Sequence, residues 1–501
     1  MKTKILLLGV IFIPFIFSCN KALVEKPYSA ISLDNFYTST DQANVALAGI
    51  YYILWQQYLY KDGAWLDLND VTGGALESYP QHRIYDSYSW SVDDPNLEGM
   101  WSALYQGINR ANVLLDKLQN SNVADKNDIM GQALFLRGLF YFDLVVTFGG
   151  VPIYTHGTYG LDSIYKPRST ADEVYAQIIS DLTQAASLMS PYNESNHQAG
   201  MATSGAALAL LADVYAQHRD WANAAKYAKQ VIDMGVFGLD ADYEHVFDPA
   251  FNNDKEKIFS IQHINGGDAT SEIGEHLVYL ASPQTATLPD GTNVQFFLNL
   301  AKSVDWVANR SFFASTPATY RRWYTMRDKM PFYYKSGSTT LTYDTVDLPA
   351  PFIVKYYHLD PSTGTNLTGV DFPIIRYSDV LLKYAEALNE VNHGPTSDAY
   401  NAINMVRERA RAVGTPYQQP ASVYPDLSNL TYEQFRDSVL TEEEREFVGE
   451  GHRRLDLLRH GLFISDAIAR GITSATPDDT LFPIPAEEIS KNPKLTQNPG
   501  Y

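Results

Sequence analysis

Cysteine is almost absent from this chain of 501 residues, since Cys19 is the only one. A single thiol has no partner for an intramolecular disulfide, and it excludes a metal site built from several cysteines. Long apolar runs are also scarce: beyond Ile5–Phe17 we expect no segment that could span a bilayer. Disorder is excluded, because 45% of the residues are hydrophobic and a chain this long buries roughly three quarters of its unfolded surface.

Basic residues are outnumbered, with 38 Lys and Arg against 58 Asp and Glu, so the formal net charge is -20. This balance repels phosphate backbones and no basic block reverses it locally, which excludes nucleic acid as a partner. The sequence also lacks Gly-x-Ser-x-Gly, a phosphate loop, His-Glu-x-x-His and the dinucleotide glycine motif. We therefore expect no enzyme activity, no metal and no cofactor. A glycoside hydrolase needs only two carboxylates, so that alternative stays open.

The amino terminus has the pattern of a secretory signal peptide. Two lysines precede the thirteen apolar residues Ile5–Phe17, and the small residue Ser18 follows them. A positive region, an apolar region and a small residue are typical of a cleaved export signal. The apolar run contains Pro14 and falls short of the about 20 residues that cross a bilayer. We expect residues 1–18 to be removed and the protein to leave the cytoplasm.

The residues Ile16–Cys19 resemble the bacterial lipoprotein box, in which the cysteine thiol is alkylated by diacylglycerol before the leader is cleaved. This resemblance implies a mature protein that begins at Cys19 and is held in a membrane by acyl chains. Each buried methylene adds about 0.8 kcal/mol, so several chains make a stable anchor.

Helical periodicity predicts a mainly α protein. Apolar residues recur at spacings of three and four from Leu97 to Leu118, and further helices are predicted at 131–148, from about 170, and as pairs within 204–234 and 377–412. In both pairs small residues are spaced as in a tetratricopeptide repeat, where they let antiparallel helices approach closely. The predicted fold is a scaffold of tetratricopeptide-like helical pairs with irregular segments between them.

Three segments have no sustained period: 61–95, 235–310 and 335–372. Loops of this length are uncommon inside compact proteins and usually carry function. They hold aromatic rings, which can lie against the C–H face of a sugar while Asp and Arg bond its hydroxyls. Packing beneath a long loop is the alternative for each single ring. The candidate glycan-binding residues are Trp65, Asp67, Tyr79, Arg83, Tyr85, Trp90 and Trp306.

Five segments, in order, resemble the SusD/RagB family of nutrient-uptake outer-membrane lipoproteins. They are MWSALYQGINRANVLL from Met100, ALFLRGLFYFDLVVTFGGVPIY from Ala133, PIIRYSDVLLKYAEALNE from Pro373, EEREFVGEGHRRLDLLRHG from Glu443 and LFPIPAEEISKNPKLTQNPGY from Leu481. The resemblance covers nearly the whole mature chain and follows a lipoprotein signal. Within these segments we expect charge-assisted bonds between helices from Arg137, Glu386, Glu446, Arg453, Asp456 and Arg459.

The resemblance implies one SusD-like domain at 19–501 behind the signal peptide 1–18, with an N-terminal part to about 234 and a C-terminal SusD/RagB part from about 235. It implies a right-handed superhelix of paired helices with a loop-rich ligand-binding face. The aromatics from Trp65 to Trp90, together with Trp306, fall where the family usually builds its site.

The same resemblance implies a starch-binding SusD-like role. The protein would be a non-catalytic, surface-exposed outer-membrane lipoprotein, anchored through Cys19, that binds oligosaccharides. Its partner would be a SusC-like TonB-dependent transporter. Some relatives bind peptides, so a peptide-binding RagB-like member is the first alternative, and a glycoside hydrolase is the second.

Overall fold

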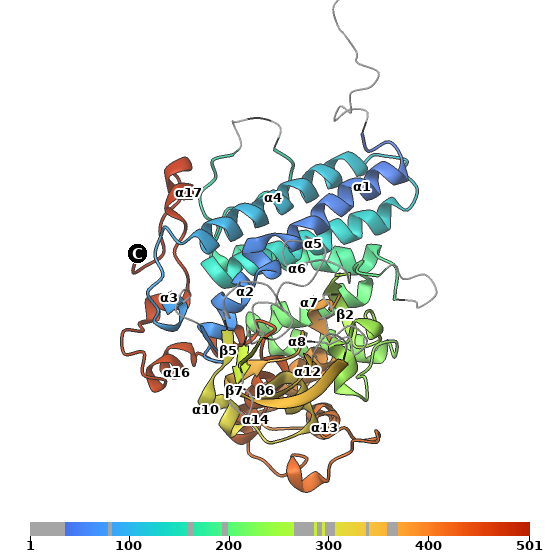
Figure 1. Ribbon diagram of the computed structural model, residues 1–501. Coiled ribbons are helices and arrows are strands. Elements are labelled where there is room, and N and C mark those ends of the chain that lie inside the picture. The colour runs from blue at the N-terminus through green and yellow to red at the C-terminus, as the bar shows by residue number, and fades with distance from the viewer. Residues whose placement is uncertain are drawn as a thin grey trace, which may run out of the picture. The chain divides into compact units, whose positions relative to one another are not determined.

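The structure is a computed structural model of the chain. It describes residues 36–78, 83–158, 160, 164–192, 199–264, 285–287, 293–295, 306–336, 340–357 and 369–501. Residues Tyr37–Tyr501 form one compact unit (Figure 1). The predicted signal peptide and Cys19 lie outside the described residues.

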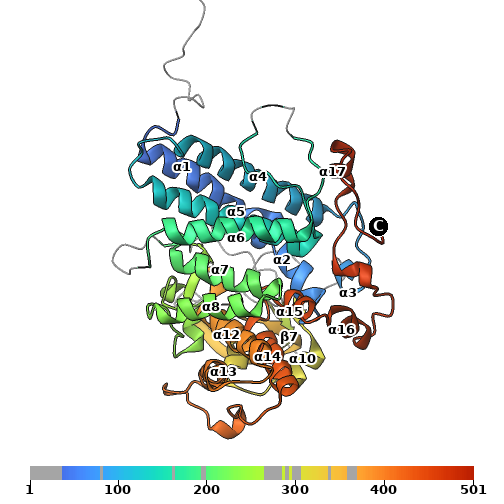
Figure 2. The same cartoon turned by 180° about the vertical axis from the view of Figure 1, so that it is seen from behind.

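Long helices form the scaffold, and from α4 onward each packs on the next along the chain, with α8 packing on α12 (Figure 1, Figure 2). The mainly helical fold predicted from periodicity is confirmed. These helices are α1 Thr40–Tyr51, α4 Pro95–Leu118, α5 Lys126–Phe148, α6 Ala171–Leu188, α7 Ser204–Gln217, α8 Trp221–Asp233, α12 Tyr377–Asn392, α13 Ser397–Ala410 and α14 Tyr432–Phe447.

Short helices connect the long ones and cover the ends of the scaffold. They are the 3-10 helix η1 Tyr52–Trp55, α2 Ala64–Leu66, α3 Arg83–Asp86, α10 Arg310–Ser315, α11 Tyr320–Thr325, α15 Arg453–Arg459, α16 Phe463–Ala469 and α17 Ala486–Lys491. Parts of the segment 61–95, which the sequence leaves without a period, are therefore helical over one or two turns.

The described strands form antiparallel pairs. β1 Leu76–Ser78 pairs with β5 Trp306–Ala308, β2 Lys257–Ile261 with β8 Phe372–Arg376, β3 Thr285–Thr287 with β4 Asn293–Gln295, and β6 Met326–Ser336 with β7 Thr340–Ile353. The β6–β7 hairpin corrects the expectation that 335–372 is irregular. Two prolines interrupt the alternation of polar and apolar residues in β7, so the period-2 signal of a strand is weak there.

Local sequence sets the helix ends. The Thr170 and Glu173 side chains form a reciprocal capping box at the start of α6, and Asp94 accepts from the backbone of α4 with Pro95 as its first residue. Both arrangements satisfy backbone N–H groups that have no partner inside a helix. At the end of α5, Gly149 adopts a φ of 75°, which only glycine adopts readily.

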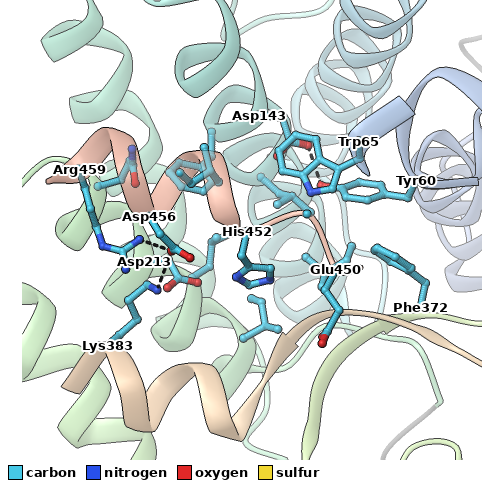
Figure 3. Close-up of a pocket in the computed structure, with 18 residues that line it drawn as sticks. Tyr60, Trp65, Asp143, Asp213, Phe372, Lys383, Glu450, His452, Asp456 and Arg459 are labelled. Atoms are coloured by element: carbon cyan, nitrogen blue, oxygen red, sulfur yellow. Dashed lines mark hydrogen bonds and ion pairs between the residues drawn. The ribbon is translucent and has the colours of Figure 1, made fainter. Parts of the chain in front are cut away.

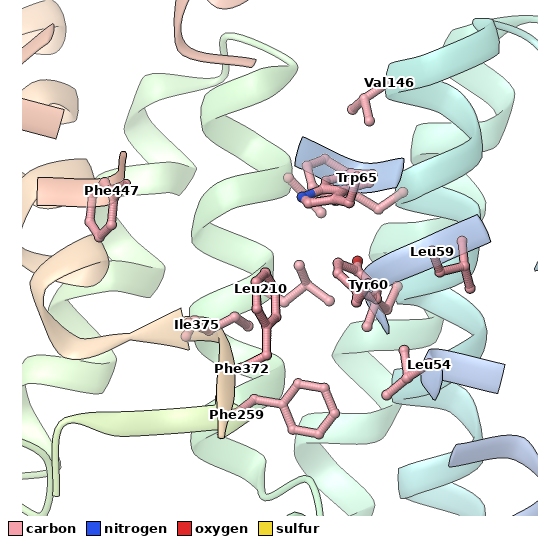
Figure 4. Close-up of a cluster of buried hydrophobic side chains, with 14 of the residues drawn as sticks. Leu54, Leu59, Tyr60, Trp65, Val146, Leu210, Phe259, Phe372, Ile375 and Phe447 are labelled. Carbon is pink, nitrogen blue, oxygen red and sulfur yellow. The ribbon is translucent and has the colours of Figure 1, made fainter. Parts of the chain in front are cut away.

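The core runs between the long helices and the β2–β8 pair. Figure 4 shows Tyr60, Trp65 and Phe372 meeting there, with aliphatic side chains of the helices around them. The ring centroids of Tyr60 lie 5.3 Å from Trp65 and 5.8 Å from Phe372. The core thus joins helices from the first half of the chain to strands from the second half.

Helix α5 is long and apolar enough to cross a membrane by length and composition, which corrects the expectation that no such segment follows the signal peptide. Inside the fold, however, 94% of its most apolar window is buried. α4 and α6 pack on opposite sides of it. Its hydrophobicity is therefore that of a core helix.

Candidate ligand-binding site

The structure places Trp306 inside the fold rather than on a ligand-binding rim. Its side chain is 1% exposed, and its indole N–H donates to Asp67 Oδ1 at 2.6 Å. The ring lies so close to Gly63 that a methyl group there would be 2.2 Å from it. In this position the ring has no face left for a sugar.

The other aromatic residues predicted to bind glycan are also packed inside the protein. Trp65 lies between Tyr60 and Gly451, while the Trp90 N–H donates to the Tyr501 hydroxyl at 2.6 Å. The Tyr85 hydroxyl donates to the Asp94 carboxylate at 2.9 Å, and burial raises the pKa of Tyr85.

The expected stacking site therefore does not fit the structure. Trp65, Asp67, Tyr85, Trp90 and Trp306 are all buried, and only Arg83 is exposed; Tyr79 lies outside the described residues. The reason is that partners distant in sequence cover these rings, as Tyr501 covers Trp90. The described rings are packed inside the protein instead, which is the alternative that the sequence left open for each of them.

The charged residues of the family-like segments behave as expected, since each forms an ion pair between helices. Arg459 of α15 contacts Glu386 of α12 at 2.7 Å, and Arg137 of α5 contacts Asp181 of α6 at 2.6 Å. The remaining pairs are Arg453–Glu444 at 3.3 Å, Lys383–Asp456 at 3.7 Å and Arg409–Glu446 at 2.5 Å.

Burial acts to raise the pKa of Glu446, but the guanidinium groups of Arg409, Arg376 and Arg321 outweigh it and hold that pKa below its usual value. These side chains hold the scaffold together. They are not placed to contact a ligand.

An interior cavity of about 60 Å³ lies among these ion pairs. Figure 3 shows Asp456, Asp213, Lys383 and Arg459 on one side of it and aromatic rings on the other. A water molecule occupies about 30 Å³ of liquid, so the cavity has room for water and none for a sugar ring. His452 lines it, and burial lowers the pKa of this histidine.

A larger hollow opens on the surface beside the end of α1 and is named here the Trp55 hollow. Its volume is about 440 Å³, which falls within the usual range for small-molecule sites. The lining residues are Ala48, Tyr51, Tyr52, Leu54, Trp55, Ala199, Gly200, Met201, Ser260, Ile261 and Gln262.

The aromatic rings of the Trp55 hollow are fixed from behind. The Tyr51 hydroxyl donates to Gln132 Oε1 at 2.7 Å and accepts from the Ala202 N–H at 2.8 Å. Trp55 stacks on His263 with ring centroids 5.2 Å apart. Tyr52, by contrast, is 46% exposed. The hollow therefore has two rings fixed by neighbouring residues, Tyr51 and Trp55, and one exposed ring, Tyr52.

Two neutral polar residues, Ser260 of β2 and Gln262 just after that strand, also line the hollow. The Ser260 hydroxyl is buried and has no hydrogen-bond partner within the part of the chain that the structure describes. Gln262 accepts from Asn253 at 2.7 Å through its amide oxygen, and its amide NH₂ lies 3.4 Å from the Ser260 carbonyl. Because the Ser260 hydroxyl is buried, the polar groups of the hollow that lie open to a ligand are the partly exposed Gln262 and the exposed Tyr52.

A second surface hollow of about 300 Å³, the Tyr165 hollow, lies between α4, the segment 152–165 and α17. Its rings are held by their own hydroxyls, which donate to backbone carbonyls: Tyr105 to Pro152 at 2.8 Å and Tyr154 to Ile164 at 2.5 Å. Tyr165 is 46% exposed. The hydroxyls of Tyr105 and Tyr154 are therefore already paired within the protein, and a ligand in this hollow has less to gain from them.

Sequence reasoning missed Tyr51, Tyr52 and Trp55, although the run YYILWQQYLY holds five aromatics in ten residues. That cluster begins at Tyr51, the last residue of α1, and was the available signal. The sequence around Ser260 gave no indication that this residue lines the hollow, because its position depends on the pairing of β2 with β8, which is distant in the sequence. Among the described residues, no group of three or more His, Cys, Asp or Glu side chains is placed to hold a metal ion.

Paired antiparallel helices with ligand-sized hollows at their surface define a helical-repeat binding scaffold. A profile described as "SusD family" matches residues 332–501, and a second one, described as "Starch-binding associating with outer membrane", matches residues 25–216. The chain belongs to the SusD family.

Similar proteins span the length of the chain. A SusD-like protein of Formosa agariphila is 26% identical over 100% of both chains. The starch-binding protein SusD of Bacteroides thetaiotaomicron is 25% identical over 83% of this chain and 80% of its own.

Solved structures share the fold. A SusD homolog from Bacteroides thetaiotaomicron has a TM-score of 0.76 at 23% identity, covering 94% of this chain and 98% of its own. Surface glycan-binding protein A from Bacteroides fluxus has a TM-score of 0.72 at 23% identity, covering 92% of this chain and 99% of its own.

Proposed function

We propose that this protein is a lipid-anchored, surface-exposed outer-membrane lipoprotein that binds oligosaccharides in the Trp55 hollow. It passes them, without hydrolysis, to a SusC-like TonB-dependent transporter. The observation that carries the proposal is the exposed ring of Tyr52 beside Trp55, with the neutral Gln262 amide lining the same hollow. That combination matches a sugar, which has C–H groups on its faces and hydroxyls at its edges.

The chemistry of the hollow favours binding over hydrolysis. Glycoside hydrolysis needs two carboxyl groups flanking the bond to be cleaved, and no carboxylate is among the described residues that line the Trp55 hollow. Relatives named for starch or glycan binding support the same conclusion. A protein that holds a glycan intact requires a transporter to take it further.

Removing one aromatic ring of the Trp55 hollow at a time tests the site. We expect Tyr52→Ala and Trp55→Ala each to weaken glycan binding by about 0.5–1.5 kcal/mol, because the ring no longer covers the sugar face. Isothermal titration calorimetry, with ligands first selected on a glycan array, measures this change. Tyr165→Ala is the matched control: Tyr165 is a tyrosine with the same 46% exposure but in the other hollow.

The control also decides between the two hollows. If Tyr165→Ala weakens binding while Tyr52→Ala leaves it unchanged, the ligand sits in the Tyr165 hollow. If the array shows no glycan ligand and mass spectrometry finds a co-purifying peptide, the peptide-binding alternative replaces the proposal. Co-purification of the lipidated protein from detergent-extracted membranes tests the partner: a TonB-dependent barrel is the expected companion.

A further inference from the structure

The Trp55 hollow has a charge character that narrows the class of its ligand. We infer that it accepts uncharged sugars and rejects glycans that carry carboxylate or sulfate groups at the bound ring. This inference rests on the proposed function, because it concerns which oligosaccharides enter that same hollow.

The lining itself contains no charged side chain among the described residues. Arginine and lysine bind carboxylate and sulfate groups most strongly, because their N–H groups form charge-assisted bonds to the oxygens. Here the polar groups at the surface of the hollow are the Gln262 amide and the Tyr52 phenol, both neutral. Such groups pair well with sugar hydroxyls, and they do not compensate an anion for its lost hydration.

The charges behind the lining have the wrong sign for an anionic ligand. Asn253, which donates to Gln262, also lies 3.4 Å from the Asp371 carboxylate. Asp371 is buried and accepts from the His263 N–H at 3.0 Å. The nearby Lys257 ammonium lies 3.8 Å from Asp254. The Lys257 ammonium is thus accompanied by acidic side chains, Asp254 and Asp371 among them, rather than placed to receive an anionic ligand.

The rest of the chain adds to this field. The formal net charge of the chain is -20. Fields of one sign around a cleft change the local concentration of charged ligands and their rates of encounter. An acidic glycan is therefore repelled before it reaches a hollow whose described lining holds no cation to receive it.

Ligands that differ only in charge give the sharpest test. Oligogalacturonides and their fully methyl-esterified counterparts share one backbone, and a glycan array adds neutral and sulfated oligosaccharides. We expect every binder to be neutral, with an affinity that stays within about twofold between low and high salt, since screening acts on charges only. An acidic glycan that binds within threefold of the best neutral one overturns the inference and leaves the proposed function standing. If no glycan binds, both fail.

A charge placed at the rim tests the cause. Ala48 is exposed on α1 and lines the hollow, so a longer side chain there enters open space on a helix surface. We expect Ala48→Lys to improve binding of acidic oligosaccharides roughly fivefold at low salt, and high salt to cancel the gain. Ala48→Glu is the control of opposite sign and brings no gain. If Ala48→Lys gives no gain at low salt, charge is not what excludes acidic glycans, and the inference fails.

Discussion

Single side chains in this protein combine ring packing with hydrogen bonding. Trp306 is the clearest case, because its ring fills the space beside Gly63 and its N–H reaches the buried Asp67 carboxylate at 2.6 Å. Hydrogen bonds to charged groups contribute about 1.5–3 kcal/mol when buried. The conformation of β5 and that of the segment around Asp67 therefore depend on each other.

Trp306→Phe tests this structural role. We expect the free energy of unfolding to fall by about 2–4 kcal/mol, since the variant loses both a bond to a charged group and part of a buried ring. Glycan affinity is expected to stay unchanged. Urea unfolding followed by circular dichroism measures the first quantity and calorimetry the second. Trp323→Phe is a suitable control, because Trp323 is 44% exposed, and it should change stability by less than about 0.5 kcal/mol.

Asp143 gives a second prediction at the residue scale, in the dependence of stability on pH. Burial raises the pKa of Asp143 to about 8, and its described partner is the Tyr60 hydroxyl at 3.0 Å. The unfolded chain ionises this carboxyl near its ordinary pKa of about 3.9, so between these values the folded state holds the extra proton. Its contribution to stability is thus complete at low pH and is lost as the pH rises towards 8.

Asp143→Asn removes that titration and keeps an oxygen that can accept from Tyr60. We expect the variant to gain stability relative to the parent as the pH rises from about 5 to about 8, by at most about 1.4 kcal/mol per pH unit. Urea unfolding of both proteins at several pH values measures the difference. Parallel curves across that range would show that Asp143 is ionised in the folded protein.

At the scale of elements, the long helices were predictable and the hollows were not. The apolar stripe from Leu97 to Leu118 places the start of α4 within two residues of its observed start at Pro95. The prediction works because the residues on one face of a helix recur every three or four positions in the sequence. The β6–β7 hairpin and the burial of Trp90 depend on contacts such as Trp90 with Tyr501, far apart in the sequence. No local pattern encodes these contacts.

Close approach of α4 and α5 depends on a glycine. A methyl group on Gly107 of α4 would lie 2.4 Å from the buried Phe140 ring of α5. Overpacking of this kind costs about 1–3 kcal/mol, so we expect Gly107→Ala to lower the thermal midpoint. Gly49→Ala on α1 is the matched control: its nearest neighbour is 4.0 Å away, and alanine there should add up to about 1 kcal/mol. Equal shifts in calorimetry would refute close packing as the cause.

For the whole molecule, buried ion pairs tie distant parts of the chain together. Arg376 contacts Glu256 at 2.8 Å and Glu446 at 2.8 Å, and Arg409 contacts both of these glutamates. Removing one partner of such a group leaves a buried charge uncompensated, which is far costlier than losing an exposed pair. These ion pairs lie within the part of the chain after residue 235. Hydrogen bonds such as that from the Arg454 guanidinium to the Val146 carbonyl, at 3.0 Å, join this part to the preceding one, in keeping with the compactness of Tyr37–Tyr501.

Membrane attachment also concerns the whole molecule. The described helix α5 is apolar enough to span a bilayer but is buried in the core, and the proposed lipid anchor places the attachment at the amino terminus. We expect Cys19→Ser to move the protein from the membrane fraction to the soluble fraction, since without acyl chains little apolar surface remains to hold it. Fractionation with immunoblotting, and mass spectrometry of the amino-terminal peptide, measure this. Thermal unfolding is the control and should not change, because Cys19 precedes the compact unit Tyr37–Tyr501. A Cys19→Ser protein that stays in the membrane would refute the lipid anchor.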